Sequence, residues 1–274
     1  MKMNARSELL LPPAPLASCL AAGIFRDTSH ARLSERDRLN YFPATPLYSV
    51  TRVFDGTLHM ASGVSDIASL RVLPSLPAIS ATPPKDHPTS SWSATDVRAI
   101  TIAIYPDAWM ALGGAPDGAN VPHAIQNALA NATLPAFWTA FCETLAPEWN
   151  ALRQDGLGWR GSHRISDWAR HVTTKAALSG TGRSLRSIER RLNRLTGQSK
   201  QAIDFFAKIE DLHARLAADP DASLADMAAA ADFSDQSHMG RSVKRVTGFS
   251  PKQLNQMIAT EEAFWCYRLL GARF

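Results

Sequence analysis

The chain has 274 residues, of which 45% are hydrophobic and 20% charged, an ordinary balance for a globular protein with room for two domains. No apolar run is long enough to span a bilayer, which argues against a membrane-spanning role. The net charge of +4 is uneven, because residues 160–274 hold 18 Lys and Arg against 12 Asp and Glu, whereas residues 1–159 hold 11 against 13. An anionic partner is therefore expected to bind the C-terminal half.

Proline and cysteine usage separates the two halves further. Fifteen of the 17 prolines precede residue 160, which favours strands and loops first and uninterrupted helices afterwards. Cys19, Cys142 and Cys266 lie far apart without a C-x-x-C pair, a pattern typical of a reducing compartment and not of a disulfide framework or a zinc site. We therefore expect a cytoplasmic protein. Residues 16–19 are similar to a lipoprotein cleavage site, but an acidic residue and three prolines interrupt the apolar stretch before it.

The first half begins with short extended segments. Residues 47–61 contain two strand-like runs around Asp55-Gly56, a dipeptide that favours a type I′ turn, and so predict a β-hairpin. Residues 82–91 are rich in proline and hydroxyl side chains and predict an exposed loop.

Residues 98–105 give the clearest strand pattern. Ile100, Ile102 and Ile104 alternate with small or polar residues, so they share one face of a half-buried strand. Pro106 then begins a short helix that the glycines at 113 and 114 end. Together these segments predict a β-rich domain over residues 1–135.

From about Ala136 onward the pattern is helical. We expect a helix over residues 165–177, a second between Ser184 and Gly197, and a longer one that ends before Asp219-Pro220. A short helix follows, then one that begins near Ser234 and ends at Gly248, and a last one that begins at Ser250-Pro251. The predicted fold class is α+β: the β-rich domain is followed by an all-α domain over residues 136–274.

Residues 184–199 and 234–250 form a weak internal repeat. Both begin with serine, contain several basic residues and end in Thr-Gly-x-Ser, and the two glycines are 51 residues apart. Each repeat follows a short helix that can support it. The arrangement predicts two helix-turn-helix units joined by a long helix.

A recognition helix packs one apolar face on its own domain and directs the opposite face to base edges and phosphates. With Ile188, Leu192 and Leu195 buried, Arg186 and Arg190 project together from the first helix with Glu189 beside them. The second helix directs Ser237, Gly240 and Arg241 outward, and Gln236 lies near its start, where recognition helices usually meet bases. Flanking basic residues are expected at phosphates: Arg183, Arg191, Arg194 and Lys200 on the first unit, and Lys244 and Arg245 on the second. Basic helix faces are commonly only solvated surface, and the repeated pattern favours the DNA-binding interpretation.

Residues 160–257 resemble the DNA-binding domain of the AraC/XylS family of bacterial transcription regulators. The strongest likeness lies in residues 233–251, FSDQSHMGRSVKRVTGFSP, and a second one in residues 184–197, SLRSIERRLNRLTG. The tail EEAFWCYR at 261–268 is similar to an extension in a subset of the family. The resemblance implies base contacts at Arg186, Glu189 and Arg190 in the first helix, and at Gln236, Ser237, Gly240 and Arg241 in the second. Asp232 and Val243 depart from the family's usual glycine and phenylalanine.

The resemblance also implies two partners, double-stranded DNA and RNA polymerase at an activated promoter. It further implies an N-terminal domain that senses a small molecule or forms a homodimer. No heptad supports dimerisation, and the sequence contains no cofactor motif or metal-ligand spacing. Trp92, Trp109 and Trp138 are expected in the core in preference to a ligand pocket. The main alternative is an enzyme that modifies DNA or converts a ligand, with an AraC-type domain appended; a DNA-repair methyltransferase, however, needs a cysteine cluster that is missing here. A nonspecific architectural protein is disfavoured, because Glu189 and Gln236 suit base reading better than phosphate neutralisation.

Overall fold

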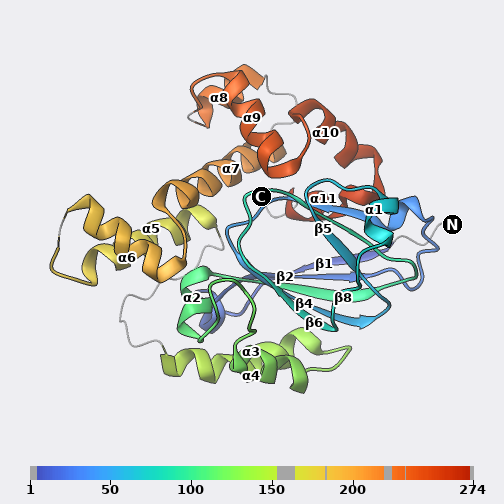
Figure 1. Cartoon of the computed structure of the whole chain (residues 1–274), viewed down its shortest axis with the longest axis horizontal. Helices are drawn as coiled ribbons and strands as arrows, with labels where there is room; N and C mark the ends of the chain where they lie inside the picture. Colours follow the sequence, from blue (N-terminus) through green and yellow to red (C-terminus); the bar gives the residue numbers. More distant parts are fainter. Residues whose placement is uncertain (1–4, 153–163, 183, 219–223, 232, 272–274) are drawn as a thin grey trace.

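The computed structural model describes residues 5–152, 164–182, 184–218, 224–231 and 233–271. Two β-sheets come first and the helices of the C-terminal half follow (Figure 1). This order confirms the predicted α+β class. Among the described residues, no helix is both long and apolar enough to cross a membrane.

The larger sheet has five antiparallel strands in the order β1-β2-β8-β4-β6. Their bounds are β1 Arg6–Leu10, β2 Leu20–Asp27, β8 Arg98–Ile104, β4 Tyr48–Asp55 and β6 Ile79–Thr82. The smaller sheet has the order β3-β7-β5, with β3 Leu39–Phe42, β7 Thr89–Trp92 and β5 His59–Ser62. The short helix α1 (Ile67–Arg71) and the 3-10 turns Ala14–Leu16 and Arg36–Arg38 connect strands.

The predicted hairpin at 47–61 is wrong in its pairing. Both runs are strands, but β4 pairs with β6 and β8 whereas β5 pairs with β7 in the other sheet. Gly56 has φ +81°, and a Cβ there would lie 2.2 Å from the carbonyl oxygen of Asp96, so the glycine serves a crossing between sheets. The exposed loop predicted at 82–91 is also too long, since Thr82 ends β6 and the buried Ser90 and Ser91 belong to β7.

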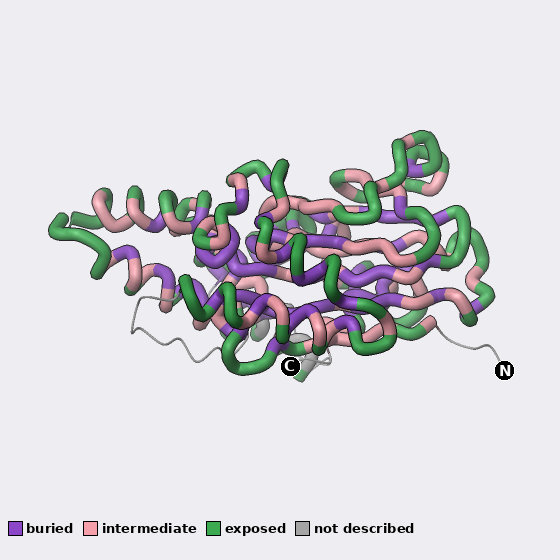
Figure 2. Tube along the Cα trace, turned by 90° about the horizontal axis from the view of Figure 1, so that it is seen from below, coloured by how far each residue is buried: buried purple, intermediate pink, exposed green. Residues whose placement is uncertain are grey.

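The strand predicted at 98–105 is confirmed as β8, at the centre of the larger sheet. Ile100, Ile102 and Ile104 are at most 1% exposed on the face covered by helices, and Figure 2 shows buried residues along the middle strands. Three helices accompany this face: α2 (Pro106–Ala111), α3 (His123–Asn131) and α4 (Phe137–Leu152). The predicted short helix from Pro106 is α2, and its Trp109 is fully buried.

The helices of the C-terminal half follow the predicted order. They are α5 Ile165–Leu178, α6 Leu185–Thr196, α7 Lys200–Ala218, α8 Leu224–Ala230, α9 Gln236–Thr247, α10 Pro251–Thr260 and α11 Trp265–Gly271, with a 3-10 turn at Glu262–Phe264. The pairs α5–α6 and α8–α9 lie at opposite ends of the long α7 in Figure 1. Two helical pairs joined by a long helix are therefore present.

The helices of the two halves share a core. Phe137 of α4 packs edge-on against Phe54 of β4, with ring centroids 5.0 Å apart, so α4 belongs with the larger sheet. In α5, Trp168 is fully buried in the same hydrophobic cluster as Ile102. Its Nε1 donates to Oδ1 of the buried Asp107 at 2.8 Å. The expected boundary after residue 135 thus falls just before a helix that packs on the N-terminal sheet.

Candidate nucleic-acid interface

Local sequence fixes both ends of α6. Ser184 precedes the helix, and its side chain accepts a hydrogen bond from the Ser187 amide at 3.3 Å. At the other end Gly197 has φ +70°, a left-handed conformation that glycine adopts at low cost. Leu192, on the inner face of α6, is fully buried. The predicted start and stop of this helix are confirmed, and of its predicted inner face Leu192 is buried while Ile188 and Leu195 are partly buried against the core.

The outer face of α6 is free to meet a ligand. Arg186, Glu189 and Arg190 are all exposed, as is Arg194 one turn on. Among the described residues, none of these four takes part in an ion pair. Two unpaired guanidinium groups four residues apart therefore face solvent together.

The other basic residues of the first unit are placed differently. Arg191 is half-buried and donates from Nε to the Ala176 carbonyl at 2.6 Å, and from Nη2 to the Gly182 carbonyl at 2.7 Å. The Arg191 guanidinium therefore links the end of α5 and the turn that follows it to helix α6. Lys200 pairs with Asp204. Arg183 lies outside the described residues.

The second helix, α9, repeats this construction. Asp235 is the N-cap, one residue after the expected Ser234, and its Oδ1 accepts from the His238 amide at 2.7 Å. That hydrogen bond is the main cause that lowers the pKa of Asp235, and the charge of Arg241 lowers it further. Gly248, with φ +84°, ends the helix as predicted. Met239, Val243 and Val246 are buried as expected.

The outer face of α9 carries the expected residues. Gln236, Ser237 and Arg241 are exposed, and so is Lys244. Gly240 is half-buried, and a Cβ at this position would meet no atom within 4 Å. The helix surface at Gly240 is therefore open to a partner that approaches closely.

Arg245 was expected at a phosphate, but here it faces the N-terminal half. Its Nη2 lies 2.8 Å from Oδ2 of Asp86, in the loop between β6 and β7, and its guanidinium lies over the Phe205 ring at 5.0 Å from the centroid. The hydrogen bond from Arg245 is the main cause that lowers the pKa of Asp86. Because the two residues are 159 positions apart, no local sequence pattern predicted this pair.

A cavity of about 340 Å3 lies between the larger sheet, the smaller sheet and the C-terminal helices. The strand β8 explains the space: its isoleucines face the helical layer, while Ala99, Thr101 and Ala103 line the cavity. The opposite wall includes Phe206 of α7 and Val246 of α9. None of the three tryptophans expected in the core lines it. Trp92 and Trp109 are buried as expected, whereas Trp138 is only partly buried against the core.

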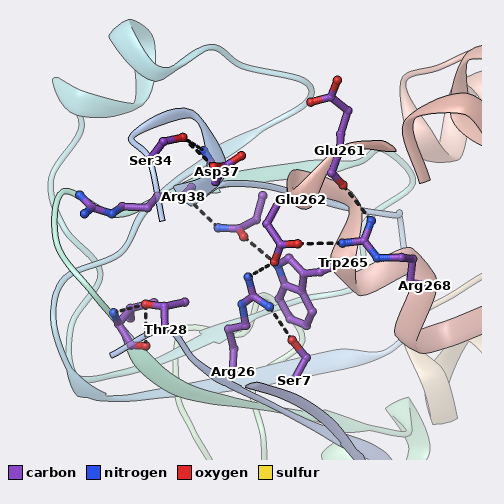
Figure 3. Close-up of polar contacts among 12 residues, drawn as sticks. Ser7, Arg26, Thr28, Ser34, Asp37, Arg38, Glu261, Glu262, Trp265 and Arg268 are labelled. Carbon is purple, nitrogen blue, oxygen red and sulfur yellow. Dashed lines mark hydrogen bonds and ion pairs between the residues drawn. The ribbon is translucent and has the colours of Figure 1, made fainter. Parts of the chain in front are cut away.

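The C-terminal segment 261–271 lines one side of this cavity through Trp265, Cys266, Tyr267 and Leu270. Figure 3 shows the polar contacts of this segment with the N-terminal half. Arg26 is 8% exposed and pairs with Glu262 at 2.6 Å, and its guanidinium lies 4.6 Å from the ring centroid of Trp265. Trp265 donates from Nε1 to Oδ1 of Asn40 at 2.7 Å, and Arg268 pairs with Glu262 at 3.0 Å. The segment that resembled a family extension is thus fastened to both sheets.

A chain of hydrogen bonds joins Ser62, His87 and Asp86. His87 accepts or donates through Nε2 to the Ser62 hydroxyl and through Nδ1 to Asp86 at 2.9 Å. Such an order of groups activates a serine nucleophile in hydrolases. Here all three residues lie on the surface, none lines the cavity, and Asp86 is shared with Arg245. We assign no chemistry to this chain.

Comparison with known proteins identifies a domain within the helical half. Residues 179–257 match the family model of a helix-turn-helix domain. No curated protein matches the sequence. Among solved structures, ToxT from Vibrio cholerae is 13% identical with a TM-score of 0.40, over 80% of this chain and 95% of that one. A structure of ToxT from Vibrio cholerae O395 gives 12% and 0.38, over 81% and 95%. The AraC-like transcriptional activator CuxR gives 12% and 0.25, over 98% and 100%. The family match shows that residues 179–257 form an AraC-type helix-turn-helix domain.

Proposed function

We propose that this protein reads a specific DNA sequence by inserting α6 and α9 into successive major grooves. The observation that carries the proposal is the matched pair of capped helices, each with a buried apolar face and an exposed face of unpaired arginine and polar side chains. The 19 residues of α7 between them span about 28 Å at 1.5 Å per residue. That length suits two helices that enter grooves about 34 Å apart on one face of DNA.

Within this proposal the residues divide by role. Bases are contacted by Arg186, Glu189 and Arg190 of α6, and by Gln236, Ser237, Gly240 and Arg241 of α9. Arg194 and Lys244 are exposed and suit phosphates, and Lys200 can join them by leaving Asp204. Arg191 holds the α5–α6 turn instead, because its guanidinium is satisfied by two carbonyls. We propose a domain boundary after α4 and, on the family resemblance, activation of RNA polymerase at the bound promoter.

Selection of bound sequences from a random duplex library tests the proposal. The full-length protein is expected to enrich a motif of two subsites about one helical turn apart. The double variant Arg186→Ala/Arg241→Ala should lose this enrichment, because both removed side chains face the bases. The matched control is Lys252→Ala, which removes an exposed cation that belongs to α10 and to neither α6 nor α9. Failure of the wild type to enrich any motif would contradict sequence reading.

A second proposed role is the sensing of a small ligand, and the cavity favours it. Its walls are mainly apolar, and three cations, Arg26, Arg38 and Lys85, line it against one acid, Glu210. Arg26 is paired with Glu262 and Arg38 donates to the Ala94 carbonyl. Lys85 has no ion-pair partner among the described residues, and burial lowers its pKa. We therefore expect a ligand with an apolar body and an anionic group.

Filling the cavity should abolish such binding. The variant Ala103→Phe directs a large ring from β8 into the space between the sheets, and anilinonaphthalene sulfonate, an apolar anion, serves as the fluorescent probe. The wild type is expected to enhance its emission, and Ala103→Phe to reduce that enhancement at least fivefold with an unchanged far-ultraviolet circular dichroism spectrum. Ala68→Phe, at an exposed position of α1, is the control. Equal enhancement in all three proteins would show that the probe binds elsewhere.

A further inference from the structure

The C-terminal ends of both recognition helices rest on one short segment of the N-terminal domain, residues 43–47. At the end of α6, Gln198 donates from Nε2 to the Pro46 carbonyl at 2.8 Å. At the end of α9, the Ala44 amide donates to the Val246 carbonyl at 2.8 Å. Only one residue separates these two attachment points. Segment 43–47 thus connects the C-terminal ends of α6 and α9, the two helices that α7 separates.

Both helix ends have the same geometry, which makes them comparable attachment points. Thr196 and Thr247 are buried, and each donates its hydroxyl to the carbonyl four residues earlier at 2.8 Å. Each hydroxyl also accepts the amide two residues later at 3.1 Å. The repeated Thr-Gly therefore ends each helix in a fixed turn, and the next residue is presented to the N-terminal domain.

The segment 43–47 has little freedom to change its length. Pro43 and Pro46 fix two of its φ angles. Thr45 exchanges two backbone hydrogen bonds with Lys85, at 3.1 and 2.9 Å, which fasten its middle to the β6–β7 loop. The β6–β7 loop also contacts α9 directly, through the ion pair between Asp86 and Arg245. Beyond the α9 end, Val64 and Pro88 lie against Gly248.

We propose that segment 43–47, with Asp86, sets the relative placement of α6 and α9 and so determines which spacing of the two DNA subsites the protein accepts. The proposal rests on the proposed function, because it concerns the same two helices on DNA. Gln198 and Asp86 act as positioning residues and touch no base. Residues 43–47 also line the cavity together with Val246, so an occupant of the cavity contacts the part of the chain that fixes the spacing.

The test compares the subsite spacings that full-length variants accept from a random duplex library. Gln198→Ala/Asp86→Asn removes one side-chain attachment at each helix end. Its matched control is Gln201→Ala/Asp96→Asn, which makes the same chemical changes at exposed side chains without a hydrogen bond or ion pair among the described residues. The wild type and the control should enrich one spacing, with at least tenfold weaker binding when two base pairs are inserted. The variant should keep both subsite sequences but show at least a threefold smaller penalty for the insertion.

Two results separate this inference from the proposed function. A variant that keeps the full spacing penalty of the wild type would overturn the inference while leaving sequence reading intact. Absence of any motif with the wild type would instead contradict the proposed function itself. Melting temperatures of the three proteins, measured beforehand, should agree within a few degrees, because the Asp86–Arg245 pair is exposed and the Gln198–Pro46 hydrogen bond is only part-buried. If the double variant has a lower melting temperature than the wild type, the spacing penalty is compared with the single variants Gln198→Ala and Asp86→Asn instead.

Discussion

Replacement of Trp168 by alanine is expected to lower the free energy of unfolding by about 3–5 kcal/mol, the range for a fully buried tryptophan. The indole is fully buried and stacks on Tyr105, with ring centroids 5.7 Å apart. Because Trp168 lies in α5 while Tyr105 follows β8, the cavity left by alanine opens between the two halves of the protein. Urea unfolding followed by circular dichroism measures the loss. Strand and helix signals should weaken together, since one core serves both.

The hydrogen bond from Trp168 to Asp107 can be separated from the packing by the variant Trp168→Phe. Burial raises the pKa of Asp107 above its usual 3.8, and the bond from Trp168 is the largest influence that lowers it. Loss of the indole N–H should raise this pKa further. A raised pKa means that the folded state favours the protonated carboxyl, so stability falls as the pH rises through the folded pKa. The cost of Trp168→Phe should therefore be larger at pH 7 than toward pH 4.

Two outcomes would contradict this account. If Trp168→Ala abolished helical signal at low urea while the strand signal kept the wild-type transition, the two halves would unfold separately and would not share a core. If the cost of Trp168→Phe were the same at both pH values, the hydrogen bond to Asp107 would contribute nothing that depends on ionisation. Phe141→Leu, within α4 and the same cluster but away from Asp107, serves as a packing control without pH dependence.

What the sequence predicted correctly depends on neighbours along the chain. Ser184 and Gly197 bound α6, and Ser250 begins α10 with a capping box that its partner Gln253 completes. A cap needs only a side chain and an amide three residues away, so the sequence contains the whole signal. The isoleucine face of β8 is similarly local. The exposed outer faces of α6 and α9 followed from this local information.

The incorrect and missing predictions involve residues far apart in sequence. The Asp55-Gly56 dipeptide predicted a hairpin because the turn signal is local, whereas β4 found its partners in β6 and β8. The pairing of Arg245 with Asp86 was missed, because nothing near Arg245 in the sequence reveals Asp86. The cavity was missed for the same reason. The small residues of β8 form a cavity wall only because Phe206 and Val246, which are distant in sequence, line the same space. Tertiary packing decides such features, and periodicity does not contain them.

Simultaneous loss of Arg190 and Arg241 is expected to weaken binding to the selected DNA motif by about 2–6 kcal/mol, the sum of about 1–3 kcal/mol for each base-reading arginine. The two side chains belong to helices that lie at opposite ends of α7 (Figure 1). Effects at such separated sites add. Fluorescence anisotropy with labelled duplexes gives the affinities of both single variants and the double variant, on the motif and on random DNA.

The comparison with random DNA decides what each arginine does. Loss of a base contact should leave random-sequence affinity nearly unchanged, whereas Lys244→Ala, at a proposed phosphate contact, should weaken both duplexes equally and reduce the salt slope by about 1. Arg190→Lys should keep the charge without the two-pronged hydrogen bond, and so should bind random DNA like the wild type but should not recover affinity for the motif. A double variant no weaker than either single one would mean that α6 and α9 do not bind DNA at the same time. Additive losses confined to the motif require both helices to occupy their subsites together, as two recognition helices held at a fixed spacing must.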